Sequence, residues 1–383
     1  MLEKEFILKI EKAAQGGDGF SHLQDGRACF VQGALPGETV LAKITNNGKD
    51  FAKAITLKVL EKNPLRESPR CPFYERCGGC SLQHASLSLQ ISMAREAICD
   101  TFRRFAHITL PENFPIHFGN PWEYRNRIRV LKTRDAFGFR EGASHHIIPV
   151  ASKCKVLVPA LQKFLESQEA LSLKTKELQV FENGNGAISY FYKGMSQKEF
   201  LEKANTSVEI AGKKIYTDAS VFFQSNLSLL PVLVKRVKEV TEPNTLLVDL
   251  FSGVGFFAAL LEDSFEKIVA VERDANCLRL ANKNLKASAT FVSEPAEDWL
   301  GKNIVSNDVS LIVDPPRTGL PQSAAEALCK SALSRLIYVS CNPVTLARDV
   351  SLLAKNGFTL DLLEGFAFYP QTPHLEMLAV LRR

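Results

Sequence analysis

Two short motifs near the C-terminal end of the chain contain residues that could carry out chemistry. One motif supplies a cysteine and the other supplies an acid. A Ser-Cys-Asn-Pro motif at residues 340–343 follows an apolar run, and a His-x-Glu motif at residues 374–376 precedes another. A cysteine thiolate is a strong nucleophile, and a carboxylate can act as a general base. Cys341 is therefore a candidate nucleophile and Glu376 a candidate base. The alternatives are a buried strand-end cysteine and a surface or capping acid.

A glycine loop at residues 249–255 joins an apolar run to a helical pattern. Gly253 and Gly255 allow a tight turn and a close approach to a ligand. The third glycine of a dinucleotide-binding fingerprint is replaced by Ala258, an allowed variant. Glu272 ends the next apolar run about twenty residues on, where an acid accepts hydrogen bonds from the ribose of an adenosine. NAD and S-adenosylmethionine both fit these residues.

An Asp-Pro-Pro-Arg motif at residues 314–317 favours S-adenosylmethionine over NAD as the cofactor. It is similar to the Asp/Asn-Pro-Pro signature of methyltransferases that act on bases, and its prolines stiffen the loop that carries Asp314. Carbon 5 of uracil is a poor nucleophile toward a methyl donor, but addition of a thiolate to carbon 6 makes an enolate with negative charge at carbon 5. A base must then remove the carbon-5 proton. Cys341 and Glu376 suit these two roles.

Four further cysteines have spacings that suggest a metal site. Cys71, Cys77 and Cys80 form a Cys-x5-Cys-x2-Cys pattern, and Cys154 is a distant fourth candidate. In a reducing compartment such cysteines indicate a metal rather than disulfides. Three close cysteines and a distant fourth fit an iron–sulfur cubane better than zinc, which usually has two Cys-x2-Cys pairs. The spacing differs from the Cys-x3-Cys-x2-Cys pattern of radical chemistry.

The apolar patterns predict the elements that position these residues. Strand-like runs separated by glycine-rich turns predict a small OB-like β-barrel over residues 1–62. A helical pattern at 87–105 and a β-rich pattern follow, within a central region at 63–215. From 216 to 383 strands alternate with helices, which predicts an α/β, Rossmann-like fold with a parallel, doubly wound sheet. The predicted strands of this last domain cover residues 246–250, 268–271, 309–313, 336–340 and 377–381. The candidate chemical residues fall at strand ends, where such folds bind ligands.

Composition and charge narrow the class of protein. The chain has 383 residues, 45% of them hydrophobic, and a formal net charge of +5. Residues 121–155 hold eight basic and three acidic side chains, a surplus as large as that of the whole chain, which suggests contact with nucleic acid or simply a solvated strand face. Acids near the N-terminus and the lack of a 20-residue apolar run predict a cytoplasmic protein that does not bind membranes. We also expect a monomer.

Taken together, these motifs resemble the RNA 5-methyluridine methyltransferases, in the branch with an N-terminal TRAM domain and an iron–sulfur cluster. The resemblance covers nearly the whole chain and includes a Phe-x-Gln-x-Asn motif at residues 222–226. It implies a 4Fe-4S cluster on the four cysteines, organising a loop that holds RNA. One departure is Phe256, where the family often has asparagine. The resemblance further implies that cofactor or target base contacts Gln224, Phe251, Gly253, Glu272 and Asp314, with Cys341 as nucleophile and Glu376 as base.

The implied reaction is the S-adenosylmethionine-dependent methylation of carbon 5 of a uridine in structured RNA. We favour 23S ribosomal RNA as the target, with the T-loop of tRNA as the alternative. One rival is a cytosine-5 DNA methyltransferase, which normally has Pro-Cys at its nucleophile, whereas this chain has Ser340 before Cys341. Another rival is a non-catalytic, redox-sensing RNA-binding protein, which the presence of both Cys341 and Glu376 disfavours.

Overall fold

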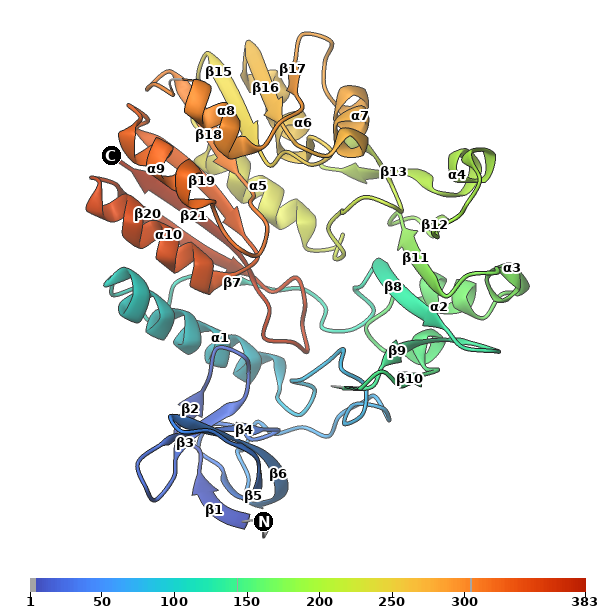
Figure 1. Ribbon diagram of the computed structural model, residues 1–383, viewed down its shortest axis with the longest axis vertical. Helices are drawn as coiled ribbons and strands as arrows, with labels where there is room; N and C mark the ends of the chain where they lie inside the picture. Colours follow the sequence, from blue (N-terminus) through green and yellow to red (C-terminus); the bar gives the residue numbers. More distant parts are fainter. Residues whose placement is uncertain (1–4, 143, 304) are drawn as a thin grey trace.

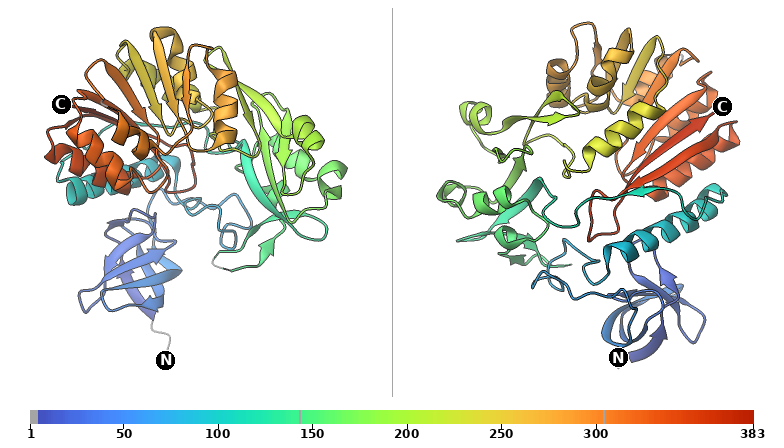
Figure 2. Two further views of the ribbon diagram at one scale, coloured as in Figure 1. Left: turned by 45° about the horizontal axis from the view of Figure 1, so that its top comes forward. Right: turned by 180° about the vertical axis from the view of Figure 1, so that it is seen from behind.

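The structure is a computed structural model that describes residues 5–142, 144–303 and 305–383 (Figure 1). Residues 1–4, part of the N-terminal segment considered above for a signal peptide, lie outside this range. The strands of the described residues form four sheets, of six, five, two and eight strands. Figure 2 shows the six-stranded sheet at one end of the molecule and the five-stranded sheet beside the eight-stranded one. Among the described residues, no helix is long and apolar enough to cross a membrane.

The N-terminal sheet is a small barrel in which strands alternate between inward and outward residues. Cys29 and Val31 of β4 point inward, as do Ala52 and Ala54 of the neighbouring strand β6, and all four are buried. The short strands β2 and β3 were not named from the sequence because each is too brief to show an alternating pattern. Strand order is β1-β5-β6-β4-β3-β2. The strands are β1 (Glu5–Lys9), β2 (Lys12–Ala13), β3 (Gly19–His22), β4 (Ala28–Gln32), β5 (Thr39–Asn47) and β6 (Phe51–Glu61).

The C-terminal sheet has the order β17-β16-β15-β18-β19-β21-β20-β7. Strands β15 to β19 run parallel, as the sequence predicted for β15, β16, β18 and β19; strand β17 was not predicted. Strand β21, by contrast, runs antiparallel to both β19 and β20. The reason is the connection between β20 and β21, whose nine residues are too few for a parallel crossover. The strands are β7 (Ile116–His117), β15 (Leu246–Leu250), β16 (Lys267–Val271), β17 (Thr290–Val292), β18 (Val309–Val313), β19 (Arg335–Ser340), β20 (Thr359–Phe366) and β21 (Glu376–Arg382).

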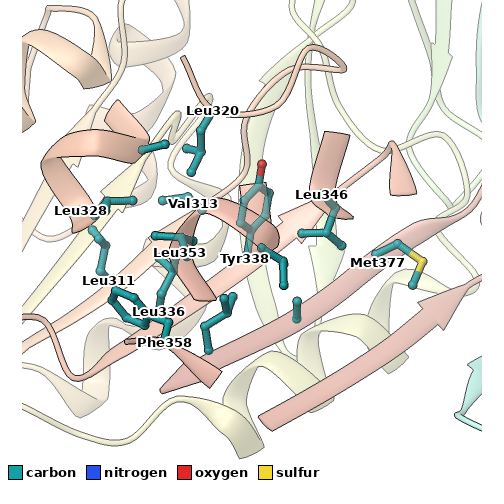
Figure 3. Packing of buried hydrophobic residues seen from close by; sticks show 14 of the residues in the cluster. Leu311, Val313, Leu320, Leu328, Leu336, Tyr338, Leu346, Leu353, Phe358 and Met377 are labelled. Atoms are coloured by element: carbon teal, nitrogen blue, oxygen red, sulfur yellow. The ribbon is translucent and has the colours of Figure 1, made fainter. Parts of the chain in front are cut away.

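Helices cover both faces of this sheet because its strand residues alternate between two apolar clusters. Leu336 and Tyr338 of β19 pack on one face, while Ile337 and Val339 pack on the other. Figure 3 shows the first face, with Tyr338 between the sheet strands and the helices above them. On this face lie α1 (Leu87–Thr101), α8 (Ala296–Lys302), α9 (Gln322–Lys330) and α10 (Pro343–Lys355). On the other lie α5 (Leu230–Val240), α6 (Phe256–Leu261) and α7 (Ala275–Asn284).

The central sheet is antiparallel and has its own core with two short helices, α2 (Pro159–Leu165) and α3 (Gln168–Ser172). A separate hairpin, β13 (Asn205–Ile210) and β14 (Lys213–Asp218), follows α4 (Gln197–Lys203) and packs on α7. Between barrel and α1, residues 62–86 contain no helix or strand. The central strands are β8 (Arg127–Lys132), β9 (Phe137–Arg140), β10 (Ile147–Ile148), β11 (Glu177–Glu182) and β12 (Ile188–Phe191).

Candidate active site

The carboxyl ends of the parallel strands meet at one edge of the eight-stranded sheet. Val271 of β16 and Val313 of β18 are both register partners of Leu250 in β15, and β19 ends beside them. A cavity of about 700 Å³ opens at this edge. All seven residues that the sequence proposed for chemistry and cofactor binding line it, namely Gln224, Phe251, Gly253, Glu272, Asp314, Cys341 and Glu376.

Strand β21 brings the candidate base to the candidate nucleophile. Ser340, the last residue of β19, pairs with Met377 in the antiparallel ladder. Cys341 follows Ser340 and Glu376 precedes Met377, so both residues lie next to this pair at the end of the ladder. Both line the cavity, and the charge of Glu376 raises the pKa of the Cys341 thiol, so the two groups are close. The antiparallel direction of β21 places its first residue at the same edge as the last residues of its parallel neighbours, which the sequence motifs alone did not reveal.

The glycine loop between β15 and α6 is fastened to Glu272. The backbone N–H of Gly253 donates to Glu272 Oε2 over 3.0 Å. Gly255 has φ of +72°, and a Cβ atom there would lie 3.1 Å from the Cβ atom of Ala281 in α7, so the helices could not pack as closely with a larger residue. Phe251 also has a positive φ, +60°, which is uncommon for an aromatic residue and typical of functional turns.

A buried aspartate lies beneath this loop. Asp249 accepts a hydrogen bond from the backbone N–H of Ala258 at Oδ2, and its Oδ1 has no partner among the described residues. Burial raises the pKa of Asp249 to about 7, and the nearby carboxylates of Asp314 and Glu272 add to the shift. In the sequence, Asp249 stands out only as the first residue of the glycine loop. An acid inside an apolar strand was the signal that could have identified it.

Several acidic groups lie buried close together around Cys341. Burial raises the pKa of Glu376, which is 2% exposed, to about 7, and Arg317 opposes this shift. Burial and then Glu376 hold the pKa of Asp314 well above its usual range. Burial is the largest cause that raises the pKa of the Cys341 thiol to about 11. The charges of Glu376 and then Asp314 add to this rise, and the charge of Arg317 opposes it. A cationic ligand would lower these pKa values, so the cavity favours a positively charged molecule.

A second buried acid, Asp349, holds the turn at residues 318–320 that follows the Asp-Pro-Pro-Arg motif. Asp349 of α10 accepts at Oδ2 from the Tyr338 hydroxyl over 2.7 Å and from the backbone N–H of Leu320 over 2.8 Å. Its Oδ1 accepts from Arg348, which also donates to the carbonyl of Thr318. This network was missed because Asp349 lies inside a helix with no motif around it.

The Phe-x-Gln-x-Asn segment is attached to the glycine loop by aromatic contacts. Phe256, the departure from the family pattern, is buried and meets Phe223 edge-on with ring centroids 5.6 Å apart. Gln224 lines the cavity and its buried Oε1 has no hydrogen-bond partner among the described residues. Asn226 donates to the carbonyl of Phe368 over 3.1 Å. The segment therefore links the cofactor side of the cavity to the chain leading into Glu376.

Outside this site, three of the four proposed metal-binding cysteines lie in the irregular segment 62–86. Cys154 is on the central domain, and each thiol is close enough to others for their charges to interact. Burial, together with the other three thiols, raises the pKa of Cys80 to about 12. Among the described residues, no three His, Cys, Asp or Glu side chains are grouped tightly enough to hold a metal ion.

A glycine loop with a strand-end acid, an Asp-Pro-Pro loop, and a cysteine near a buried glutamate line one cavity, as expected of an S-adenosylmethionine-dependent methyltransferase. Comparison with known proteins agrees. Residues 303–383 match the family described as tRNA (Uracil-5-)-methyltransferase, and residues 3–57 match the TRAM domain. An RNA methyltransferase of Treponema denticola, itself uncharacterized, is 30% identical over 417 residues, covering 100% of both chains.

Two further relatives are informative. A 23S rRNA (uracil(1939)-C(5))-methyltransferase of Shewanella halifaxensis is 30% identical over 437 residues, covering 99% of this chain and 96% of the relative. The crystal structure of the tRNA (uracil-54, C5)-methyltransferase of Pyrococcus abyssi with S-adenosyl-L-homocysteine shares the fold, with a TM-score of 0.75, 21% identity and coverage of 98% and 100%. The chain belongs to the S-adenosylmethionine-dependent RNA uracil-C5 methyltransferases.

Proposed function

We propose that this chain methylates carbon 5 of a uridine in 23S ribosomal RNA, with Cys341 as nucleophile and Glu376 as base. The observation that supports the mechanism is that Cys341 and Glu376, which flank the register pair Ser340–Met377, line the same cavity as the glycine loop. The ribosomal target is supported by full-length similarity to the Shewanella enzyme. The basic stretch 121–155 of the central domain supplies cations for a polyanionic partner.

The proposed reaction begins with the Cys341 thiolate forming a bond to carbon 6 of the uracil. The electron pair of the carbon 5–carbon 6 double bond moves to carbon 5 and its conjugated carbonyl. Carbon 5 then takes the methyl group from the sulfonium of S-adenosylmethionine, and neutral S-adenosylhomocysteine leaves. The carboxylate of Glu376 removes the carbon-5 proton, the double bond reforms and the thiolate is expelled. One proton is released from Glu376 per turnover.

Because the pKa of the Cys341 thiol is high, binding of the substrates must lower it before the thiolate can attack. At a pKa of about 11 only a small fraction is thiolate near neutral pH. S-adenosylmethionine carries a sulfonium cation, and bound in this cavity it would favour the thiolate and the carboxylates of Glu376 and Asp314 together. Arg317, whose charge already lowers the pKa of both Cys341 and Glu376, acts in the same direction. We therefore expect the methyl donor to bind before the thiolate attacks.

The remaining cavity residues are proposed to hold the two substrates. Glu272 would accept hydrogen bonds from the ribose hydroxyls of S-adenosylmethionine, and Gly253 gives its backbone room. Phe251 would line the adenosine side. Gln224, with its unpartnered buried oxygen, and Asp314, with its raised pKa, would bind the polar edge of the target base. With the methyl donor bound, an ionised Asp314 can accept a hydrogen bond from the N3–H group of uracil.

The target is tested by mapping 5-methyluridine in RNA from a strain that lacks this gene. Loss of one or more 5-methyluridines from 23S ribosomal RNA, restored by the gene but not by its Cys341→Ala variant, is the expected result. Loss confined to tRNA position 54 would instead assign the alternative target, that of the Pyrococcus abyssi enzyme whose fold the chain shares. Unchanged RNA in both classes would contradict the proposal.

We also propose that Cys71, Cys77, Cys80 and Cys154 bind a 4Fe-4S cluster. Support comes from the donor set, three thiols of one loop and Cys154 of the central domain, whose charges interact, and from backbone N–H groups of Gly79, Val156 and Leu157 at the sulfurs of Cys77 and Cys154. Because the thiols among the described residues are not grouped tightly enough to hold a metal ion, binding of the cluster would have to draw them closer together. Anaerobically purified protein should be brown with about four irons per chain. A colourless protein with one bound zinc would contradict the cluster.

A further inference from the structure

The chain that leads into Glu376 is held by two buried glutamines. Gln371 lies five residues before Glu376 and has φ of +70°, a conformation that a glutamine adopts only when its surroundings impose it. Gln90 of α1 supplies that constraint. The backbone N–H of Gln371 donates to Gln90 Oε1 over 2.9 Å, and Gln90 Nε2 donates to Gln371 Oε1 over 3.1 Å. The exposed fractions are 6% for Gln90 and 3% for Gln371.

The same two residues contact the cysteine loop, which we define as residues 70–82. The carbonyl of Gln371 accepts from the backbone N–H groups of Ser81 (2.9 Å) and Leu82 (3.0 Å), the two residues that follow Cys80. Gln90 Nε2 also donates to the carbonyls of Leu82 and Ala85. Both polar atoms of the Gln90 side chain and Oε1 of Gln371 are thus bonded within one buried network, and such networks fix a single geometry.

The segment 367–375 has further attachments at its other residues. The hydroxyl of Tyr124 donates to the carbonyl of Pro370 over 2.9 Å, and Asn226 binds the carbonyl of Phe368. These bonds tie the segment to the central domain and to the cofactor side of the cavity. Among the described residues, only the Gln90–Gln371 pair connects the segment 367–375 to the cysteine loop by hydrogen bonds. This pair therefore joins the segment to the loop.

We propose that Gln90 and Gln371 are positioning residues for Glu376, and that they couple the order of the cysteine loop to removal of the carbon-5 proton. The proposal rests on the proposed role of Glu376 as base. A carboxylate displaced by even 1 Å loses much of its efficiency in proton transfer. Loosening the cysteine loop therefore slows proton removal while leaving the cofactor side, which is built on β15 and β16, unchanged.

Hydrogen exchange tests the coupling without reference to activity. In full-length Gln90→Met, the backbone N–H groups of Ser81, Leu82, Gln371, Thr372 and residues 374–376 should all exchange at least about 10-fold faster than in the native protein. The matched control is Thr101→Val, which removes a buried hydroxyl from the same helix. That hydroxyl donates to Gln15 Oε1 and to the carbonyl of Ala97 within α1. Unchanged exchange in residues 371–376, or an equal change in Thr101→Val, would overturn the coupling.

The second measurement is trapping of the RNA–protein adduct on ordinary uridine RNA. Gln90→Met should lower turnover about 10-fold and accumulate adduct, as Glu376→Gln should, because only breakdown of the adduct is slowed. A fall in turnover with no adduct, or unchanged turnover, would overturn the positioning role. If Glu376→Gln itself turns over normally, the proposed base fails, while hydrogen exchange still decides the coupling.

Gln371→Gly provides the test if Gln90→Met does not fold. Glycine accepts a φ of +70° and keeps the main-chain bonds to Ser81, Leu82 and Gln90, so only the side-chain bond from Gln90 Nε2 is lost. Exchange of residues 371–376 should rise and adduct should accumulate, both by less than in Gln90→Met. Native behaviour in both measurements would show that the glutamine pair does not position Glu376.

Discussion

The edge of the eight-stranded sheet and the cysteine loop are positioned in different ways. At the sheet edge, the registers between β15, β16, β18, β19 and β21 decide which residues meet. The cysteine loop has no helix or strand, and its place is decided by separate hydrogen bonds to residues as distant in sequence as Gln371. Substitutions at the sheet edge should therefore remove chemistry and leave the structure intact, whereas substitutions in the loop should change order and binding.

The largest effect is expected for Cys341→Ala. Without the thiolate no adduct forms, so turnover should fall by at least about 10³-fold and 5-fluorouridine RNA should give no denaturation-resistant complex. The native enzyme should give that complex in the presence of S-adenosylmethionine, because fluorine at carbon 5 cannot leave as a proton. Cys329→Ala on α9, outside the cavity, is the control and should behave like the native enzyme. Normal turnover by Cys341→Ala would exclude covalent catalysis.

Glu376→Gln should have the next largest effect, roughly 10²–10³-fold on turnover, with adduct accumulating on unmodified uridine RNA. The native rate of adduct breakdown should depend on pH, because Glu376 works as the carboxylate and its pKa is raised to about 7. The rate should rise about tenfold per pH unit below 7 and level off above it.

The control for this variant is Glu326→Gln on α9, which lies outside the cavity. Glu376→Gln should also lose the rise in rate between pH 6 and pH 8, measured by following release of RNA from trapped adduct. A pH profile that persists unchanged in Glu376→Gln would mean that another group, such as a water molecule, removes the proton.

The difference between the two regions also explains how far the sequence could be interpreted. Glu272, Asp314 and Cys341 could be identified because each follows an apolar run, and parallel strands bring such positions to one edge. The proximity of Cys341 and Glu376 could not be predicted, because the direction of β21 depends on the short connection from β20. The Gln90–Gln371 pair joins residues 281 positions apart, and no local pattern reports such a contact.

A smaller effect is expected for Cys80→Ser in the cysteine loop. Loss of one ligand should remove the brown colour and lower RNA affinity by about 10-fold, since ordering this loop costs about 1–2 kcal/mol per residue that metal–thiolate bonds offset. Binding of S-adenosylmethionine, measured by calorimetry, should stay within about twofold of the native value. Cys99→Ser on α1 is the control. Equal loss of cofactor and RNA binding would show that the two regions are not separate.

The smallest effect is expected where the sheet edge is supported by side chains rather than by strand register. Tyr338→Phe removes the hydroxyl that donates to Asp349, but Asp349 keeps its bonds from Leu320 and Arg348. The free energy of unfolding should fall by about 1–2 kcal/mol, measured by urea denaturation. Turnover should fall less than about threefold, because the remaining bonds still hold the Asp-Pro-Pro-Arg loop. Tyr216→Phe, on the partly exposed hairpin strand β14, is the control and should change neither quantity. If Tyr338→Phe instead loses turnover as severely as Glu376→Gln, then this hydroxyl, and not the strand register alone, determines where Asp314 lies.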